Sequence, residues 1–345
     1  MYKTITEGKA KIKVPVETKI SKELPVFYNP AMELNRTISV LVLTNISNKN
    51  MQICSPLSGT GVREIRQIKE LPANKIKQIW INDYSKEAEK IIKENLKLND
   101  IKKKVTVSCE DANMMILKSA GFDYIDIDPF GTPNPFLDSA IKRISRDGIL
   151  AVTATDTSAL SGTYPDVCQR KYWAKPLHNH QMHEIGIRIL ARKVQLIGAQ
   201  FEKALTPIYC HSTEHYMRIY FKCEKGKKKV DEIIKKHGTF MDAGPMWLGK
   251  LWDEKLAHKI AAKTDNKMLK TISEESKIDT IGFYDTHQFC KKNKQKIPQI
   301  EQIMNEIQKK GFLATRTHFN DWAIKSNLTP EEFLETIKSI NRSCN

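Results

Sequence analysis

An aspartate followed by proline and phenylalanine, Asp128-Pro129-Phe130, is the segment of this 345-residue chain with the most specific chemistry. It follows the apolar run 124–127, which is typical of a buried strand. Proline restricts the residue before it and cannot extend a strand, so we expect Asp128 at the strand's carboxyl end. A carboxylate oxygen there can accept a hydrogen bond from an amine, and an aromatic ring can stack on a flat base. A capping aspartate in a turn is the structural alternative.

The same three residues resemble the Asp/Asn-Pro-Pro-aromatic motif of methyltransferases that act on exocyclic amines. Such an amine is a poor nucleophile because its lone pair is conjugated to the ring of the base. An oxygen that accepts the amine's hydrogen localises the lone pair toward the methyl group to be transferred. The segment therefore predicts methyl transfer to the amino group of a nucleobase.

A second candidate site begins at Gly59-Thr60-Gly61, where a predicted strand passes into a helix. Glycines let the backbone turn tightly and approach a ligand, although a turn without a ligand explains this segment equally well. Asp83 ends the next predicted strand, and its carboxylate can accept hydrogen bonds from two ribose hydroxyls. Asp111 follows the third strand, where an acid can bind an adenine amino group or cap a helix. Together these residues indicate a nucleoside cofactor.

Short β-branched runs alternate with amphipathic stretches between residues 51 and 223, which is typical of parallel strands joined by helices. The clearest helix spans 85–96, and another spans about 183–199. The last two strands lie too close together for a parallel crossover, so we expect them to be antiparallel, as in class I methyltransferases. The predicted strands are 51–57, 78–82, 105–109, 124–127, 148–153, 207–211 and 215–223.

The charged segment 224–229 indicates a loop or domain boundary, which divides the chain into 1–223 and 224–345. The second part is predicted to be mostly helical. One helix begins near Pro298 and ends before Gly311, and Thr329-Pro330-Glu331-Glu332 has the order of a capping box. We therefore expect an α/β, Rossmann-like class I methyltransferase domain with a seven-stranded mixed sheet, followed by a smaller, mostly helical C-terminal domain.

Lysine and arginine number 56 against 40 acidic residues, a net charge of +16 that favours a polyanionic partner such as RNA or DNA. A lysine-rich surface that only keeps the protein soluble is the alternative. No apolar run is long enough for a membrane helix, and lysines recur through the first 14 residues, where a signal peptide would have an apolar segment. We therefore expect a cytoplasmic protein. The seven cysteines are scattered without CxxC spacing, which predicts neither a disulfide framework nor a zinc site.

Longer segments resemble the family of tRNA guanine N2-dimethyltransferases that modify position 26, and the resemblance covers nearly the whole chain. Archaeal members are nearest in length. The matching segments are Phe27-Tyr28-Asn29-Pro30, Asn35-Arg36, Gly59-Thr60-Gly61-Val62-Arg63 with Arg66, Asp128-Pro129-Phe130-Gly131-Thr132-Pro133, Thr153-Ala154-Thr155-Asp156, the run 183–190, His215-Tyr216, the run 244–249 and the run 315–319.

This resemblance implies S-adenosyl-L-methionine as cofactor and tRNA as substrate. The small helices and basic surface of the C-terminal part indicate a domain that binds the tRNA, with helices that serve only packing as the alternative. The family's residues for the cofactor correspond to Arg36, Arg66, Asp83, Asp111 and Ala112 of this chain. The correspondence is part of the resemblance. It implies Asp128 as the catalytic aspartate and Phe27 and Phe130 as the rings that sandwich a flipped guanine. Arg63 is the less certain arginine of its pair and could be a residue of the helix surface.

One segment departs from the family. Many members carry cysteines of a zinc site beside the Gly-Pro-x-Trp-Leu-Gly run, where this chain has Phe240-Met241-Asp242-Ala243. We therefore expect no stoichiometric metal. Two alternatives to the position-26 enzyme remain open: an amine methyltransferase acting on another tRNA guanine or on other RNA or DNA, and a tRNA-binding protein that has lost catalysis.

Overall fold

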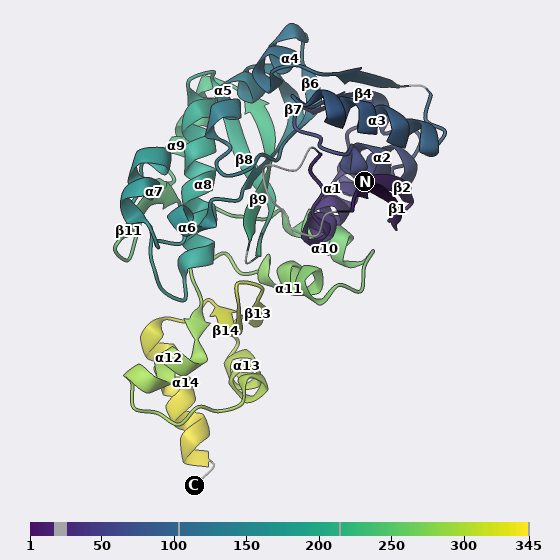
Figure 1. The fold of residues 1–345 in the computed structure, drawn as a ribbon. Helices are drawn as coiled ribbons and strands as arrows, with labels where there is room; N and C mark the ends of the chain where they lie inside the picture. Colours follow the sequence, from purple (N-terminus) through teal and green to yellow (C-terminus); the bar gives the residue numbers. More distant parts are fainter. Residues whose placement is uncertain (17–25, 103, 214, 344–345) are drawn as a thin grey trace. The chain divides into compact units, whose positions relative to one another are not determined.

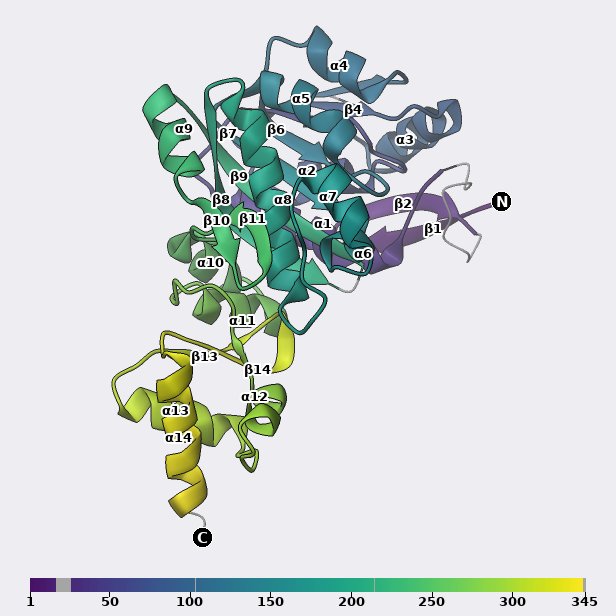
Figure 2. The ribbon, with the colours of Figure 1, turned by 90° about the vertical axis from the view of Figure 1, so that its left-hand side faces the viewer.

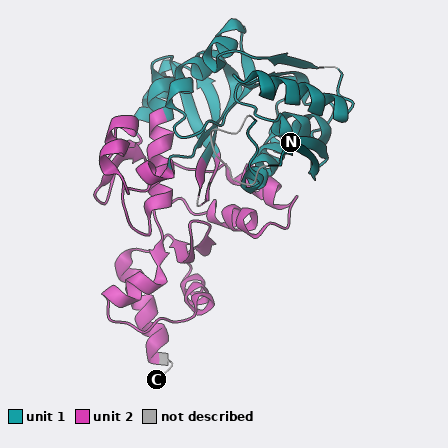
Figure 3. Ribbon diagram, viewed as in Figure 1, with its two compact units in different colours: residues 1–156, 194–208, 218–235 teal, residues 157–193, 209–217, 236–345 magenta. Residues whose placement is uncertain are grey.

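The computed structural model describes residues 1–16, 26–102, 104–213 and 215–343, and the chain divides into two compact units (Figure 3). Unit 1 comprises residues 1–156, 194–208 and 218–235, and unit 2 comprises 157–193, 209–217 and 236–345. The chain therefore passes between the units several times. The predicted linear division after residue 223 cuts the chain once and stays a prediction. No helix in the described ranges combines the length and apolarity that a membrane crossing needs.

A seven-stranded sheet in the order β5-β4-β3-β6-β7-β9-β8 forms the centre of the fold (Figure 1). Neighbouring strands from β5 to β7 pair in parallel. β8 and β9 are neighbours whose connection is too short for a parallel crossover, so they are antiparallel and the sheet is mixed. All seven predicted strands are confirmed, namely β3 (Met51–Ser55), β4 (Ile76–Asn82), β5 (Val105–Ser108), β6 (Phe122–Ile127), β7 (Ile144–Ala154), β8 (Lys203–Thr213) and β9 (Tyr216–Lys225).

Two groups of helices accompany the parallel strands. One group contains α1 (Glu33–Asn45), α2 (Val62–Glu70) and α3 (Lys86–Leu98), with α2 in contact with both of the others. The other contains α4 (Ala112–Lys118) and α5 (Asn134–Arg143), which pack on each other. The strand order reverses between β3 and β6, and in such sheets ligands bind at the carboxyl ends of the strands beside the reversal. The fold thus directs attention to the loops after β3 and β6.

An N-terminal hairpin that the sequence pattern did not predict joins unit 1. Strands β1 (Tyr2–Glu7) and β2 (Ala10–Pro15) pair antiparallel, and β2 packs on α2 and α3 (Figure 2). The backbone N–H groups of Lys11 and Lys13 donate to the side chains of Asn99 and Asn95 of α3. These bonds satisfy buried polar groups of the hairpin and fix it on the helix.

The prediction of a loop at 224–229 is wrong. Strand β9 continues to Lys225, Gly226 has a φ of +139°, and α9 (Lys227–Ile234) begins directly after it. The first three lysines of α9 are exposed, whereas Val230 and Ile233 are buried. The high charge of the segment therefore reflects the solvated turn of an amphipathic helix, which has the same local composition as a loop.

Helices predominate in unit 2, as the sequence predicts, but two small sheets connect them. β10 (His237–Phe240) pairs with β11 (Ala243–Trp247), and a three-stranded sheet has the order β12-β14-β13. These strands were not predicted because each is short and lacks a clear alternation. The remaining elements are η1 (Pro30–Met32) of unit 1, α6 (Thr157–Leu160), α7 (Pro165–Tyr172), α8 (Met182–Ala199), α10 (Glu254–Ala261), α11 (Lys267–Glu275), β12 (Tyr284–Asp285), α12 (Thr286–Lys292), α13 (Ile300–Lys309), β13 (Ala314–Thr317), β14 (Asn320–Ser326) and α14 (Pro330–Ser343).

The last two helices follow the predicted apolar stripes. Ile300, Ile303 and Ile307 of α13 pack with Phe333 and Ile337 of α14 in one buried cluster. The predicted capping box is confirmed, because Glu332 N–H donates to the Thr329 hydroxyl and Thr329 N–H donates to the Glu332 carboxylate. This region folds around its own small core.

Candidate active site

The carboxyl ends of β3, β4, β5 and β6 lie along one edge of the sheet, because all four strands are parallel. Each strand is followed by a residue or turn that the sequence singled out: Gly59-Thr60-Gly61, Asp83, Asp111 and Asp128. The topology therefore brings both parts of the predicted chemistry to one edge.

The glycine turn and Asp83 are bonded to each other. One oxygen of Asp83 accepts from Gly59 N–H at 2.8 Å, and the other accepts from Ser85 N–H at 3.0 Å. Burial raises the pKa of Asp83, and these N–H bonds oppose the rise. Gly59 has a φ of +54°, and a side chain there would meet the Phe27 carbonyl at 2.6 Å. The turn therefore needs glycine on two grounds, backbone conformation and close approach.

Arg36 and Arg66 meet at a carboxylate that the sequence analysis missed. Glu7 of β1 accepts from Arg36 Nε at 2.7 Å and from Arg66 Nη1 at 3.0 Å. Burial alone would raise the pKa of Glu7, but the hydrogen bonds and charges of Arg36 and Arg66 lower it. Both guanidinium groups are thus directed to one protein carboxylate, and Arg66 also pairs with Glu70.

Asp111 and Ala112 begin α4. The Asp111 side chain is exposed and accepts from Met114 N–H at 3.0 Å, so it caps the helix as the structural alternative proposed. Ala112 is buried as the first residue of the helix. A role of either residue in cofactor binding stays a prediction.

The two predicted stacking rings, Phe27 and Phe130, lie against each other. Their centroids are 4.3 Å apart, the planes meet at 78°, and Phe130 is 44% exposed. In this arrangement the rings close the space that a base would fill, so a base can enter between them only if the rings separate. Asp128 lies two residues before Phe130 in the chain, and its side chain is 15% exposed.

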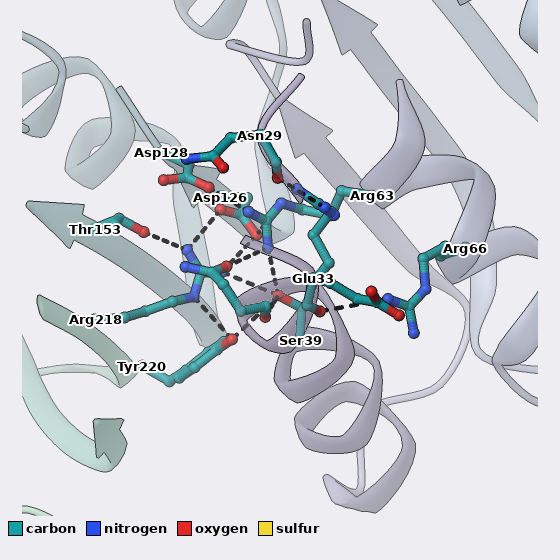
Figure 4. A network of polar contacts seen from close by, with 12 residues as sticks. Asn29, Glu33, Ser39, Arg63, Arg66, Asp126, Asp128, Thr153, Arg218 and Tyr220 are labelled. Carbon is teal, nitrogen blue, oxygen red and sulfur yellow. Dashed lines mark hydrogen bonds and ion pairs between the residues drawn. The ribbon is translucent and has the colours of Figure 1, made fainter. Parts of the chain in front are cut away.

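Asp128 belongs to a network of buried charges (Figure 4). Arg63 donates to one oxygen of Asp128, and its Nε lies 3.6 Å from Asp126. Arg218 of β9 binds both oxygens of Asp126, at 2.7 and 3.1 Å. Burial alone would raise the pKa of Asp126, but the charges of Arg218 and Arg63 lower it. Arg63 is 8% exposed, so the alternative of a helix-surface residue is wrong.

Three residues of this site were not assigned from the sequence: Glu7, Asp126 and Arg218. Asp126 had a signal, since an acid interrupts the run 124–127 two residues before Asp128. Glu7 and Arg218 had none, because each reaches the site from a strand far away in the chain. Among the described residues, no group of three or more His, Cys, Asp or Glu side chains could hold a metal ion.

The donor set fits a nucleoside ligand that carries a carboxylate. Asp83 can accept from ribose hydroxyls, and two arginines can bind the acid group. The buried hydroxyl of Thr60, inside the glycine turn, has no hydrogen-bond partner among the described residues.

Comparisons with known proteins agree with this chemistry. The profile of N2,N2-dimethylguanosine tRNA methyltransferases matches residues 8–243 and 238–338. The tRNA (guanine(26)-N(2))-dimethyltransferase of Methanobrevibacter smithii is 39% identical over 99% of this chain and 98% of its own length. The tRNA (guanine(26)-N(2)/guanine(27)-N(2))-dimethyltransferase of Aquifex aeolicus is 37% identical over 97% of this chain and 96% of its own length.

A solved structure is similar over nearly the whole chain. Trm1 from Pyrococcus horikoshii, in complex with S-adenosyl-L-methionine, is 35% identical and has a TM-score of 0.88. The similarity covers 97% of this chain and 99% of that one. Both units thus have counterparts in a single known structure.

Proposed function

The chain belongs to the family of N2,N2-dimethylguanosine tRNA methyltransferases, and we propose that it methylates the exocyclic N2 amine of guanine 26 in tRNA, once or twice, with S-adenosyl-L-methionine. The observation that carries the proposal is the meeting of the Gly59 turn, Asp83 and Asp128-Pro129-Phe130 at one sheet edge. This edge combines residues suited to a nucleoside with residues suited to an amino group.

The cofactor-binding residues are Arg36, Arg66, Asp83, Asp111 and Ala112 in this proposal. Asp83 accepts the ribose hydroxyls, and the two arginines hold the methionine carboxylate, in company with Glu7 or in its place. When bound, S-adenosyl-L-methionine supplies a methyl group on a sulfonium that is open to attack by an amine. The protein's contribution is to position the amine.

Asp128 orients the target amine, and the two phenylalanines hold the base. One oxygen of Asp128 accepts an N–H of the amine, which localises the nitrogen lone pair. A guanine flipped out of the tRNA stacks between Phe27 and Phe130 after the rings separate. Pro129 keeps Asp128 at the strand end, close to the proposed position of the base between the two rings.

The second region supplies contacts to the tRNA backbone. This second region is the proposed accessory domain and comprises residues 224–345, after the predicted division at residue 223. Exposed lysines lie in the segment from α12 to α13, at Lys291, Lys292, Lys294 and Lys296. Because each phosphate contact releases counterions, tRNA affinity of the full chain should fall steeply as salt increases. An affinity insensitive to salt would return these lysines to a role in solubility.

Nucleoside mass spectrometry tests the activity and its position. The purified chain is incubated with S-adenosyl-L-methionine and three tRNA transcripts. One has guanine at both positions 26 and 27, the second has adenine at position 26 only, and the third has adenine at position 27 only. We expect N2-methylguanosine and N2,N2-dimethylguanosine whenever position 26 is guanine. Product that persists with adenine at 26 and disappears with adenine at 27 would favour guanine 27, which the name of the Aquifex relative includes. Absence of any methylated nucleoside would favour a non-catalytic tRNA-binding protein.

A further inference from the structure

Arg63 and the nearby Arg66 form ion pairs with different acidic residues. The two residues lie three positions apart on α2, but Arg66 turns to Glu7 and Glu70, whereas Arg63 turns to Asp128. The side chain of Arg63 is 9% exposed, so its guanidinium is removed from water. A buried arginine must be paired, and its partners therefore define its role.

Three groups besides Asp128 lie close to the Arg63 guanidinium. Its Nη1 donates to Asn35 Oδ1 at 2.8 Å and to Ser39 Oγ at 2.6 Å, and its Nε faces Asp126 at 3.6 Å (Figure 4). The remaining group, Nη2, donates to Asp128 Oδ2. The planar fork thus has a defined orientation before it reaches Asp128.

A second arginine leaves Arg63 available for Asp128. Arg218 binds both oxygens of Asp126 and also donates to Thr153 at 2.6 Å, while Tyr124 donates to Asp126 at 2.6 Å. Asp126 is therefore neutralised mainly by Arg218. Arg63, although it also lies 3.6 Å from Asp126, is the arginine that forms an ion pair with Asp128.

We propose that Arg63 is a positioning residue for methyl transfer: it holds Oδ2 of Asp128, so that Oδ1 faces the amine of the target base. This inference rests on the proposed function of Asp128. Among the described residues, Oδ1 of Asp128 has no hydrogen-bond partner, and Arg63 is the only one that Oδ2 has. Without Arg63 the carboxylate is free to rotate about χ1 and χ2, and the aligned geometry is populated for only part of the time.

The test uses full-length protein with Arg63→Met, which keeps much of the side-chain volume and removes the charge and the donors. Arg143→Met is the matched control, because Arg143 lies on α5 of the same unit and, among the described residues, donates only to the Leu117 carbonyl. We expect kcat on the guanine-26 transcript to fall roughly thirtyfold or more. The affinity for S-adenosyl-L-methionine, measured by calorimetry, should stay within about twofold of the wild type, and Arg63→Lys should be intermediate.

A double-mutant cycle distinguishes positioning from general structural support. If Arg63 acts through Asp128, then Arg63→Met should change the rate by less than about twofold in an Asp128→Asn background. Additive losses in the cycle, or a loss of cofactor affinity in Arg63→Met, would overturn the proposal. Normal kcat in Arg63→Met would also overturn it, whereas an inactive wild type in the same assay would contradict the proposed function instead.

Asn35→Ala provides a variant that disturbs folding less. This change removes the hydrogen bond from Arg63 Nη1 to Asn35 Oδ1. Among the described residues, the Asn35 side chain has no other hydrogen-bond partner. We expect a several-fold lower kcat with unchanged cofactor affinity and unchanged KM for tRNA. An unchanged kcat in this variant would show that the orientation of Arg63 does not matter and would contradict the proposal.

Discussion

Each unit contains a buried carboxylate that is neutralised by two cations, and the two clusters differ in what they lead to. In unit 2, Glu184 accepts from Arg188 at 2.8 Å and from Lys325 at 3.1 Å, and Gly282 N–H donates to it as well. The three side chains are at most 3% exposed. In unit 1, the cluster around Asp126 continues through Arg63 to Asp128, which is 15% exposed.

The comparison separates a structural cluster from one that supports a site. A closed ion cluster can only hold its elements together, since both oxygens of Glu184 are occupied by protein groups. An open cluster keeps one carboxylate oxygen free at the surface and uses its buried members to orient it. Stability should therefore depend on the cluster around Glu184, and chemistry on the cluster that ends at Asp128.

The largest effect is expected for Glu184→Gln. This change leaves Arg188 and Lys325 buried with too little negative charge, which typically costs about 3 to 5 kcal/mol. Chemical denaturation followed by circular dichroism measures the loss. Glu301→Gln, at an exposed pair with Arg316, is the control and should unfold like the wild type. Equal stability of the two variants would contradict a structural role of the cluster.

Acid and neutral pH should affect the two regions in opposite directions. The charges of Lys325 and Arg188 outweigh burial and lower the pKa of Glu184 to about 2, so its contribution is present above about pH 4.5 and is lost as pH falls toward 2. Burial raises the pKa of Glu64 in unit 1 to about 7, so stability falls as pH rises from about 4.5 to 7. Across each of these two pH ranges, the free energy of unfolding should change by about 3 kcal/mol.

Denaturation at a series of pH values measures these slopes in the full chain. Glu184→Gln should flatten the acid limb, and Glu64→Gln should flatten the decline between pH 4.5 and 7. A wild-type curve without either slope would argue against both assignments. A slope that survives in its own variant would remove that carboxyl from the explanation.

Asp128→Ala should impair chemistry strongly, and any loss of stability should reflect only the charge that buried Arg63 loses. The loss of one positioned acceptor at a poor nucleophile should lower the rate about a hundredfold or more, with cofactor affinity nearly unchanged. Single-turnover kinetics and calorimetry are the measurements. Asp138→Ala is the control, since Asp138 is exposed on α5 and pairs with Lys142. Normal turnover in Asp128→Ala would show that the open end of the cluster is not the catalytic residue.

Asp83→Ala should weaken the cofactor and leave the ion cluster around Asp126 intact. The lost hydrogen bonds to the ribose are worth about 1.5 to 3 kcal/mol, or about tenfold to a hundredfold in affinity. Calorimetric titration with S-adenosyl-L-methionine tests this. The melting temperature without cofactor is the companion measurement, because Asp83 also accepts from Gly59 and Ser85. Unchanged affinity would place the ribose elsewhere.

The smallest effect is expected from metal removal. If ion pairs and apolar contacts alone stabilise unit 2, a chelator should leave the melting temperature unchanged, and elemental analysis should find no stoichiometric zinc. One equivalent of zinc, or a lower melting temperature with chelator, would show that unit 2 depends on a metal as well as on its ion cluster.

Local patterns were sufficient to predict the sheet and the residues at its edge. The β-branched runs identified β3 to β9, and the ends of these runs located Asp83 and Asp128. At Asp128 the following Pro129 also marks where the strand stops. The capping box at Thr329 could also be predicted, because all of its groups lie within four consecutive residues. These features depend on neighbours in the sequence.

The charged partners could not be predicted, because their pairing depends on the completed fold. Glu7 meets Arg66 across 59 positions and Arg218 meets Asp126 across 92, and neither residue carries a local signal of its partner. The sequence offered Arg63 as a cofactor ligand or a surface residue, and only its burial between Asp126 and Asp128 excludes the surface. Long-range electrostatic pairing therefore limits what a local analysis can provide.

The distance along the chain between Asp126 and Arg218 also has a consequence for how the protein is made. Asp126 lies on a central strand, but its main counterion arrives only with β9, 92 residues later. During synthesis the first 156 residues therefore contain Asp126 with Arg63 near it but without Arg218, so burial of this acid carries a larger desolvation cost until β9 has been made. The charge pairing behind the site is complete only when β9 joins the sheet.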